Sequence, residues 1–186
     1  MLEWVLELDE KIFLSLNGLG SPHLDTFMIW MSDKYLWIPL YLYLIFRLYQ
    51  QEGKKILWPL ITLIIVIICT DQTTAGFMKP YFERLRPCKD PALGDLIVII
   101  GECRGKFGFA SGHAANSFGL AALFYFKERS FFSKGLLLWA AIVSYSRVYL
   151  GVHYPADILV GMLVGVFWAY VLYATMKSFR LRAKAY

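Results

Sequence analysis

The sequence predicts an all-α integral membrane protein: a helical bundle with five transmembrane helices and an amphipathic interfacial helix at the N-terminus. Of the 186 residues, 58% are hydrophobic and 17% are aromatic, and the mean hydropathy of +0.51 exceeds what a soluble core of this size needs. The apolar residues form five runs that are long enough to cross a bilayer. There is no internal repeat and no low-complexity segment, so we expect a single membrane-embedded domain over residues 1–186.

The N-terminal segment is predicted to lie at the membrane surface. Within residues 1–17, apolar side chains recur near helical spacing, and acidic side chains, including Asp9, occupy the other faces of the helix. A glycine-rich stretch then breaks the pattern, so we assign residues 1–20 to an interfacial helix and its turn. The segment lacks the basic region, the uninterrupted apolar stretch and the cleavage site of a secretory signal, and we expect no processing.

Five apolar runs follow, and each is expected to cross the bilayer. The first run contains Pro39, which can kink a helix. A polar loop, residues 80–108, separates the second run from the third. The predicted spans cover residues 27–49, 56–78, 110–126, 132–150 and 158–176.

The loops between these spans differ in charge from one side of the membrane to the other. One side holds ten basic and two acidic residues, a net charge of +8, and the other holds the remaining nine basic and twelve acidic residues, a net charge of −3. The positive-inside rule places the first side and the C-terminus in the cytoplasm, and the polar loop outside. If the third span, about 17 residues long, were too short to cross, everything after it would be inverted. The basic residues form no continuous stripe, which argues against a nucleic acid as a partner.

Two of the three cysteines, Cys88 and Cys103, fall in the outward loop, and Cys69 lies inside the second span. A disulfide between Cys88 and Cys103 would close a loop of about 16 residues and contribute about 3 kcal/mol of stability in the chain-entropy model. The alternative is two free thiols.

Three polar clusters are predicted to meet at the outward membrane surface. They occupy residues 79–87, 110–113 and 146–157, each at the end of a predicted span. Three cations from these clusters would form a site for a multiply charged oxyanion such as phosphate. The hydroxyl of Ser111 and the backbone amide of Gly112, at the start of a helix, would add donors. The phosphate-binding residues predicted in this way are Lys79, Arg86, Ser111, Gly112 and Arg147.

Two histidines in these clusters are predicted to carry the chemistry. His153 and Asp157 are four residues apart where Pro155 suits a first helical turn, so the carboxylate can orient one ring nitrogen and leave the other free to attack. The expected intermediate is a phosphohistidine, and His113, on another helix, is the expected general acid. The third histidine, His23, is left as a loop residue.

Each of these residues also has an ordinary structural interpretation. Lys79, Arg84 and Arg86 directly follow a span and could be interfacial anchors or contacts to lipid headgroups. Asp71 lies two turns before Lys79, and we expect it to support the site by pairing with one of its cations or by hydrogen bonds to a neighbouring threonine. Ser146 is also expected to support the site from behind.

The three clusters resemble the signature of the type 2 phosphatidic acid phosphatase family. That signature is Lys, six residues, Arg-Pro; then Pro-Ser-Gly-His; then Ser-Arg, five residues, His, three residues, Asp. Every spacing fits, and the one departure is Ala110 where the family usually has proline. The resemblance implies an all-helical bundle, the phosphate-binding and catalytic residues assigned above, and no metal or other cofactor. Soluble haloperoxidases that hold vanadate share the pattern, but the five apolar runs argue against that branch.

The resemblance is to short bacterial members, which implies a multi-pass protein of the bacterial plasma membrane whose active site faces the exterior or periplasm. An outward-facing site in such a chain favours undecaprenyl diphosphate as the substrate. The alternatives are phosphatidylglycerol phosphate, phosphatidic acid and the phosphates of lipid A. An alternative of another class is a lipid or ion transporter, but this would need polar residues spread along the spans rather than gathered at one face.

Overall fold

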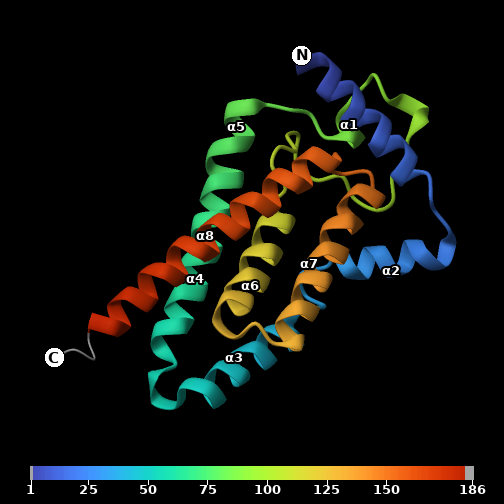
Figure 1. Cartoon of the computed structure of the whole chain (residues 1–186). Coiled ribbons are helices and arrows are strands. Elements are labelled where there is room, and N and C mark those ends of the chain that lie inside the picture. Colours follow the sequence, from blue (N-terminus) through green and yellow to red (C-terminus); the bar gives the residue numbers. More distant parts are fainter. Residues whose placement is uncertain (1, 183–186) are drawn as a thin grey trace.

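The chain is all-α in the computed structural model, which describes residues 2–182 (Figure 1). Residues 183–186, the end of the predicted cytoplasmic C-terminus, lie outside the described residues. Short 3₁₀ turns lie at Gly53–Lys55, Pro87–Lys89 and Gly94–Leu96. The α-helices are α1 (Leu2–Asn17), α2 (Pro22–Ser32), α3 (Ile38–Glu52), α4 (Leu57–Asp71), α5 (Lys79–Phe82), α6 (Gly112–Glu128), α7 (Phe131–Tyr149) and α8 (Pro155–Arg182).

Helix α6 lies at the centre of the bundle, against α4, α7 and α8 (Figure 1). Its buried face is lined mainly by small residues, which let neighbouring backbones come close. On the α8 side, Gly161 and Gly165 are four residues apart, and a methyl group on either would collide with the backbone carbonyl of Ser111 or Ala115. This glycine pair therefore permits direct backbone contact between α6 and α8.

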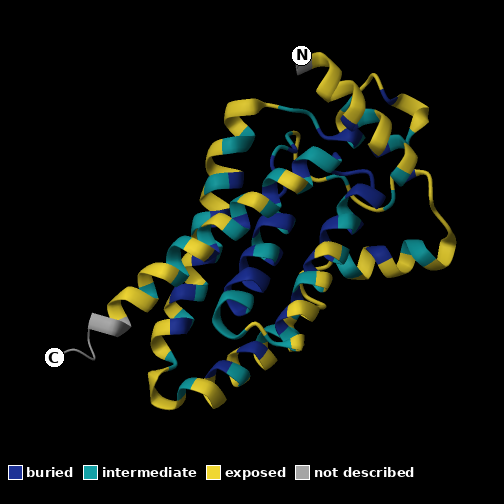
Figure 2. Ribbon diagram, in the orientation of Figure 1, coloured by how far each residue is buried: buried dark blue, intermediate teal, exposed yellow. Residues whose placement is uncertain are grey.

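Two helical segments within residues 2–182 are long and apolar enough to cross a membrane. One is α8, over Pro155–Phe179, and the other is the continuous stretch Leu57–Phe82, which joins α4 to α5 through a π-helical segment at Gln72–Met78. The third and fourth predicted spans are shorter helices, α6 and α7. Large apolar side chains are exposed on the outer faces of the bundle, as expected when lipid is the solvent (Figure 2).

The prediction of one span over residues 27–49 is wrong, because this stretch forms two helices, α2 and α3. The Asp33 carboxylate accepts a hydrogen bond from the Tyr35 amide at 2.9 Å and stabilises a turn between them. The Trp37 indole N–H donates to the Met31 carbonyl at 3.0 Å and closes the turn. Pro39 therefore lies in the first turn of α3, where its missing N–H is tolerated, and does not kink a longer helix.

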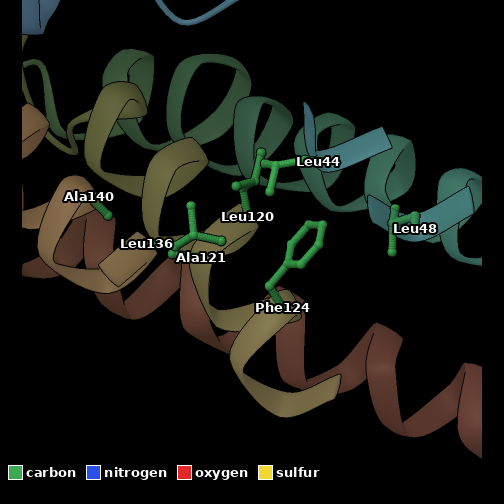
Figure 3. Close-up of a cluster of buried hydrophobic side chains, with 7 residues drawn as sticks. All are labelled: Leu44, Leu48, Leu120, Ala121, Phe124, Leu136 and Ala140. Carbon is green, nitrogen blue, oxygen red and sulfur yellow. The ribbon is translucent and has the colours of Figure 1, made fainter. Parts of the chain in front are cut away.

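The apolar core has separate clusters at the two ends of the bundle. At one end, α3, α6 and α7 meet through seven buried side chains (Figure 3). At the other end, Phe13 of α1 packs with Leu93, Val148 and Tyr154. The second cluster fixes α1 against the loop and the start of α8. Helix α1 therefore does more than lie on the surface, because one of its faces is part of the core.

The long loop between α5 and α6 is held in place at several points. Cys88 and Cys103 are joined by a disulfide, with their Cα atoms 6.2 Å apart. The Cys88 amide donates to the Gly151 carbonyl at 3.1 Å and ties the loop to the α7–α8 connection. Leu85 and Phe107 form an isolated antiparallel bridge, so the chain around Leu85 is extended. Arg84 and Arg86 therefore leave this segment on the same side.

Candidate active site

The three polar clusters come together at the end of the bundle that carries the long loop. Lys79 is the first residue of α5, Arg147 lies in the last turn of α7, and His113 lies in the first turn of α6. Together with Arg86 and His153 they line one cavity of about 1070 Å³. Residues that are far apart in the sequence are thus brought to a single site.

His153 is buried, with 1% of its surface exposed. Its Nδ1 lies 3.1 Å from Oδ2 of Asp157, and its Nε2 lies 3.2 Å from Nη1 of Arg86. Because the arginine can only donate, Nε2 is the acceptor and Nδ1 carries the proton, which it donates to the carboxylate. Burial lowers the pKa of His153 well below the usual 6.5, and the nearby charges of Arg86 and Arg147 lower it further. The ring is therefore neutral, with a lone pair on Nε2.

Asp157 lies directly behind this ring and is completely buried. Besides the histidine, its Oδ2 accepts the backbone N–H of Tyr154 at 3.1 Å. Its Oδ1 accepts from Nη1 of Arg84 at 3.1 Å. The carboxylate is thus fixed at both oxygens and holds the imidazole in one orientation.

Arg86 and Arg147 keep buried donors that are unpaired within the described part of the chain. Arg86 donates through Nη1 to the Val152 carbonyl at 3.1 Å, and Arg147 donates through Nη1 to the hydroxyl of Ser32. The Nε atoms of both arginines are buried, and neither has a hydrogen-bond partner among the described residues. Buried donors of this kind are normally satisfied, and an oxyanion between the two side chains would supply the acceptors.

Ser111 and Gly112 form the N-terminus of α6. The Ser111 amide donates to the Asp157 carbonyl at 3.0 Å, which joins this helix start to the first turn of α8. The Ser111 hydroxyl oxygen accepts from the Ala114 amide at 3.5 Å, so its own proton is available to another acceptor. A Cβ at Gly112 would lie 3.5 Å from Oγ1 of Thr74, an ordinary contact distance, so this helix start lies beside the π-helical segment Gln72–Met78.

The two predicted supporting residues differ in position. Asp71 lines the cavity near Gly112. The threonines proposed as its partners donate elsewhere: Thr70 to Oδ1 of Asn116 at 2.5 Å, and Thr74 to the Thr70 carbonyl at 2.9 Å. The hydroxyl of Ser146 donates to the Val143 carbonyl at 2.7 Å within its own helix.

The cavity continues from the charged end between helices α3, α4, α6 and α7. Its walls there are apolar and are formed by Leu44, Leu63, Ile67, Leu120 and Val143. An amphipathic ligand could place an anionic group on the cations and a hydrocarbon chain along these walls. The shape and lining of the cavity thus fit a lipid that carries a phosphate.

Sequence reasoning missed three residues at this site: Asp9, Ser32 and Arg84. Asp9 was assigned to a polar face of the N-terminal helix, but it is buried and forms an ion pair with Arg84 at 2.6 Å. A signal for Arg84 existed in the spacing, because Arg84 and Arg86 alternate as residues on one side of an extended segment do. Asp9 and Ser32 gave no such signal, since their partners lie 75 and 115 residues away.

Comparison with known proteins gives a family and its relatives. The sequence pattern of the PAP2 superfamily matches residues 56–180. A lipid A 4'-phosphatase of Bacteroides thetaiotaomicron is 36% identical over 178 residues, which cover 93% of this chain and 79% of that protein. An undecaprenyl-diphosphatase of Sulfolobus acidocaldarius is 28% identical over 160 residues, covering 83% of this chain and 72% of that protein. The crystal structure of Aquifex aeolicus LpxE superimposes with a TM-score of 0.72 at 25% identity and covers 89% of this chain and 94% of that one.

Proposed function

The chain belongs to the PAP2 superfamily, whose members are metal-independent lipid phosphate hydrolases, and we propose that it removes the 4'-phosphate of lipid A. The observation that carries this choice is the 36% identity to a lipid A 4'-phosphatase over 93% of the chain. Sequence analysis favoured undecaprenyl diphosphate and kept lipid A as an alternative. The relatives support that alternative better than the first choice. The family also removes the reason to consider a transporter.

Undecaprenyl diphosphate remains the second candidate substrate. Its support is the undecaprenyl-diphosphatase of Sulfolobus acidocaldarius, which is less similar, at 28% identity over 83% of the chain. Both substrates present a phosphate group on a lipid, so the cation cluster and the apolar walls of the cavity suit either of them.

In the proposed mechanism, His153 is the nucleophile. Its neutral Nε2 attacks phosphorus while the bond from phosphorus to the lipid oxygen breaks, and His113 donates a proton to that oxygen. The dephosphorylated lipid leaves, and a phosphohistidine remains. His113 then takes a proton from water, the resulting hydroxide attacks phosphorus, and the P–N bond breaks to release inorganic phosphate and restore Nε2.

The proposed phosphate-binding residues stabilise the charge that the reaction develops. Lys79, Arg86 and Arg147 offset the negative charge on the equatorial oxygens, and Ser111 and the Gly112 amide add hydrogen bonds at a helix N-terminus. The support for this arrangement is that Lys79, Arg86, Gly112 and Arg147 line one cavity, with Ser111 directly before Gly112 and buried Nε donors on both arginines. No cofactor takes part in the proposed steps.

We also propose a single membrane-embedded domain that crosses the bilayer five times. The crossing helices are α3, the continuous stretch Leu57–Phe82, α6, α7 and α8, while α1 and α2 lie at the outer surface. This assignment keeps the active site outside, in the exterior or periplasm, and the +8 side in the cytoplasm. It moves the first crossing from residues 27–49 to α3.

Phosphate release by the purified full-length protein in a chelating buffer tests this proposal. The panel is lipid A, undecaprenyl diphosphate, phosphatidylglycerol phosphate and phosphatidic acid, with His153→Ala as the control, and mass spectrometry identifies which lipid A phosphate is lost. We expect fastest release from lipid A, loss of the 4'-phosphate, and no release by His153→Ala. Faster release from undecaprenyl diphosphate would move the assignment to the second candidate, and undiminished release by His153→Ala would overturn the mechanism.

A further inference from the structure

We infer that Asp9 and Arg84 are positioning residues: a chain of hydrogen bonds runs from α1 through Arg84 to Asp157 and fixes the carboxylate that orients His153. Asp9 lies outside the three polar clusters, and Arg84 lies within the first of them, but neither is among the residues proposed to hold phosphate or to carry out the reaction. The inference rests on the proposed role of His153 as the nucleophile.

Arg84 bridges two carboxylates with the two ends of its guanidinium group. Nη1 donates to Oδ1 of Asp157 at 3.1 Å, and Nη2 donates to Oδ2 of Asp9 at 2.6 Å. The side chain is 19% exposed, and its guanidinium carbon lies 4.0 Å from the centre of the Tyr154 ring. The planar fork makes both contacts and the stacking at once, which the single ammonium group of a lysine cannot do.

Asp9 anchors this arrangement to the start of α8. Its Oδ1 accepts the backbone N–H of Ala156 at 2.8 Å, so an α1 side chain caps the helix that carries Asp157. One turn later on the same face of α1, the ring of Phe13 packs edge-on against Tyr154, with ring centroids 5.3 Å apart. Helix α1 therefore contacts the chain segment between His153 and Asp157 twice, through one polar and one aromatic contact.

The Asp157 carboxylate depends on Arg84 for the hydrogen bond to one of its two oxygens. Oδ2 is shared by His153 and the Tyr154 amide, whereas the hydrogen bond to Oδ1 comes from Arg84. The group is completely buried, and a charged oxygen without a donor is costly there. Without Arg84 the carboxylate would turn to find another donor and would pull the hydrogen bond away from Nδ1 of His153.

The surrounding backbone leaves little room for other arrangements. The Gly108 amide donates to the Arg84 carbonyl at 2.8 Å and holds this part of the loop in place. A Cβ at Gly108 would lie 2.9 Å from Oδ2 of Asp157 and 3.5 Å from Nδ1 of His153, so the glycine backbone forms a wall beside both groups. The imidazole is therefore held at Nδ1 by Asp157 and at Nε2 by Arg86, and Asp9 and Arg84 fix the Asp157 carboxylate from outside the catalytic segment.

The test compares two variants of the full-length protein, Asp9→Asn and Arg84→Lys, with two matched controls. Glu7→Gln removes an exposed acid from the same helix, and Arg129→Lys makes the same exchange at an exposed arginine. Each protein is assayed for kcat and KM on lipid A, the inhibition constant of inorganic phosphate, the rate of phosphohistidine formation in a single turnover, and Tm. Neither Asp9 nor Arg84 lines the cavity that would hold phosphate, so effects on binding and on chemistry can be separated.

We expect kcat and phosphohistidine formation to fall about 10- to 100-fold in both variants, as small misplacements of a reacting group do. KM and the inhibition constant of phosphate should stay within about twofold of the unchanged protein, and the controls should match it in every measurement. Because both residues act through one path, the double variant should be no slower than the worse single one.

The outcomes separate this inference from the proposed function. Release of phosphate by His153→Ala would overturn the nucleophile assignment and the inference with it. If His153→Ala is inactive while Asp9→Asn and Arg84→Lys turn over like Glu7→Gln, the inference alone is overturned. A lower Tm with an unchanged kcat per folded molecule in both variants would reduce Asp9 and Arg84 to structural residues and would also overturn it.

Discussion

Ion pairs occur at both ends of the bundle, but the two ends use them differently. At the end formed by the α3–α4 and α6–α7 connections, Arg47 binds Glu128 at 2.9 Å and Lys127 binds Glu52 at 2.6 Å (Figure 1). Both of these cations have an acidic partner on another helix. At the loop end, Arg84 is shared between two buried carboxylates, and the buried Nε donors of Arg86 and Arg147 have no partner within residues 2–182. Paired charges connect helices, whereas unpaired donors around a cavity are available to a ligand.

The largest effect should come from His153→Ala at the loop end. Removal of the proposed nucleophile should lower kcat about 10⁴-fold or more. Phosphate binding should persist, because Lys79, Arg86 and Arg147 remain. Steady-state phosphate release and inhibition by inorganic phosphate measure the two properties separately, and a loss of inhibition equal to the loss of rate would contradict this division.

Arg86→Lys should give the next largest effect. The substitution keeps the positive charge but removes the Nε donor and the fork, so kcat/KM should fall about 100-fold, as it does when one oxyanion donor is removed. The assay is lipid dephosphorylation with Arg104→Lys as the matched exchange at an exposed arginine whose partner is Glu102. Equal activity of the two variants would mean that charge alone suffices at position 86.

The disulfide should contribute to stability more than to chemistry. Replacing Cys88 and Cys103 by alanine should lower the free energy of unfolding by about 3 kcal/mol, because the loop between them is no longer closed in the unfolded chain. Denaturant unfolding in detergent measures this loss. The exchange Cys69→Ala removes the free thiol and serves as the control. A loss in the double variant no larger than in the control would contradict a stabilising role of the cross-link.

The smallest effect should come from the opposite end. Glu128→Gln keeps the shape of the side chain but removes the charge that Arg47 binds, and this pair is only partly buried. The free energy of unfolding should fall by about 1 kcal/mol, and kcat should not change. A fall in kcat for this variant would contradict this division of roles between the two ends, because it would connect the paired end of the bundle to the chemistry.

The sequence is informative about contacts between residues that are close together in the chain. His153 and Asp157 are four residues apart, and their contact follows from the first turn of a helix. It was misleading where partners are distant. The polar pattern of residues 1–17 places Asp9 on a polar face, since hydropathy treats every acid alike, and its burial is explained by two distant partners, Arg84 and the backbone N–H of Ala156. Likewise, an apolar run over residues 27–49 concealed the turn at Asp33, which depends on a local hydrogen bond.

The glycine contact between α6 and α8 has a consequence for how the two histidines move. His113 belongs to the first turn of α6, and His153 is held by Asp157 in the first turn of α8. Because Gly161 and Gly165 let these helices touch through their backbones, and the Ser111 amide binds the Asp157 carbonyl, both starts form one mechanical unit. We therefore expect the proposed proton donor and the proposed nucleophile to move together when a lipid enters and leaves.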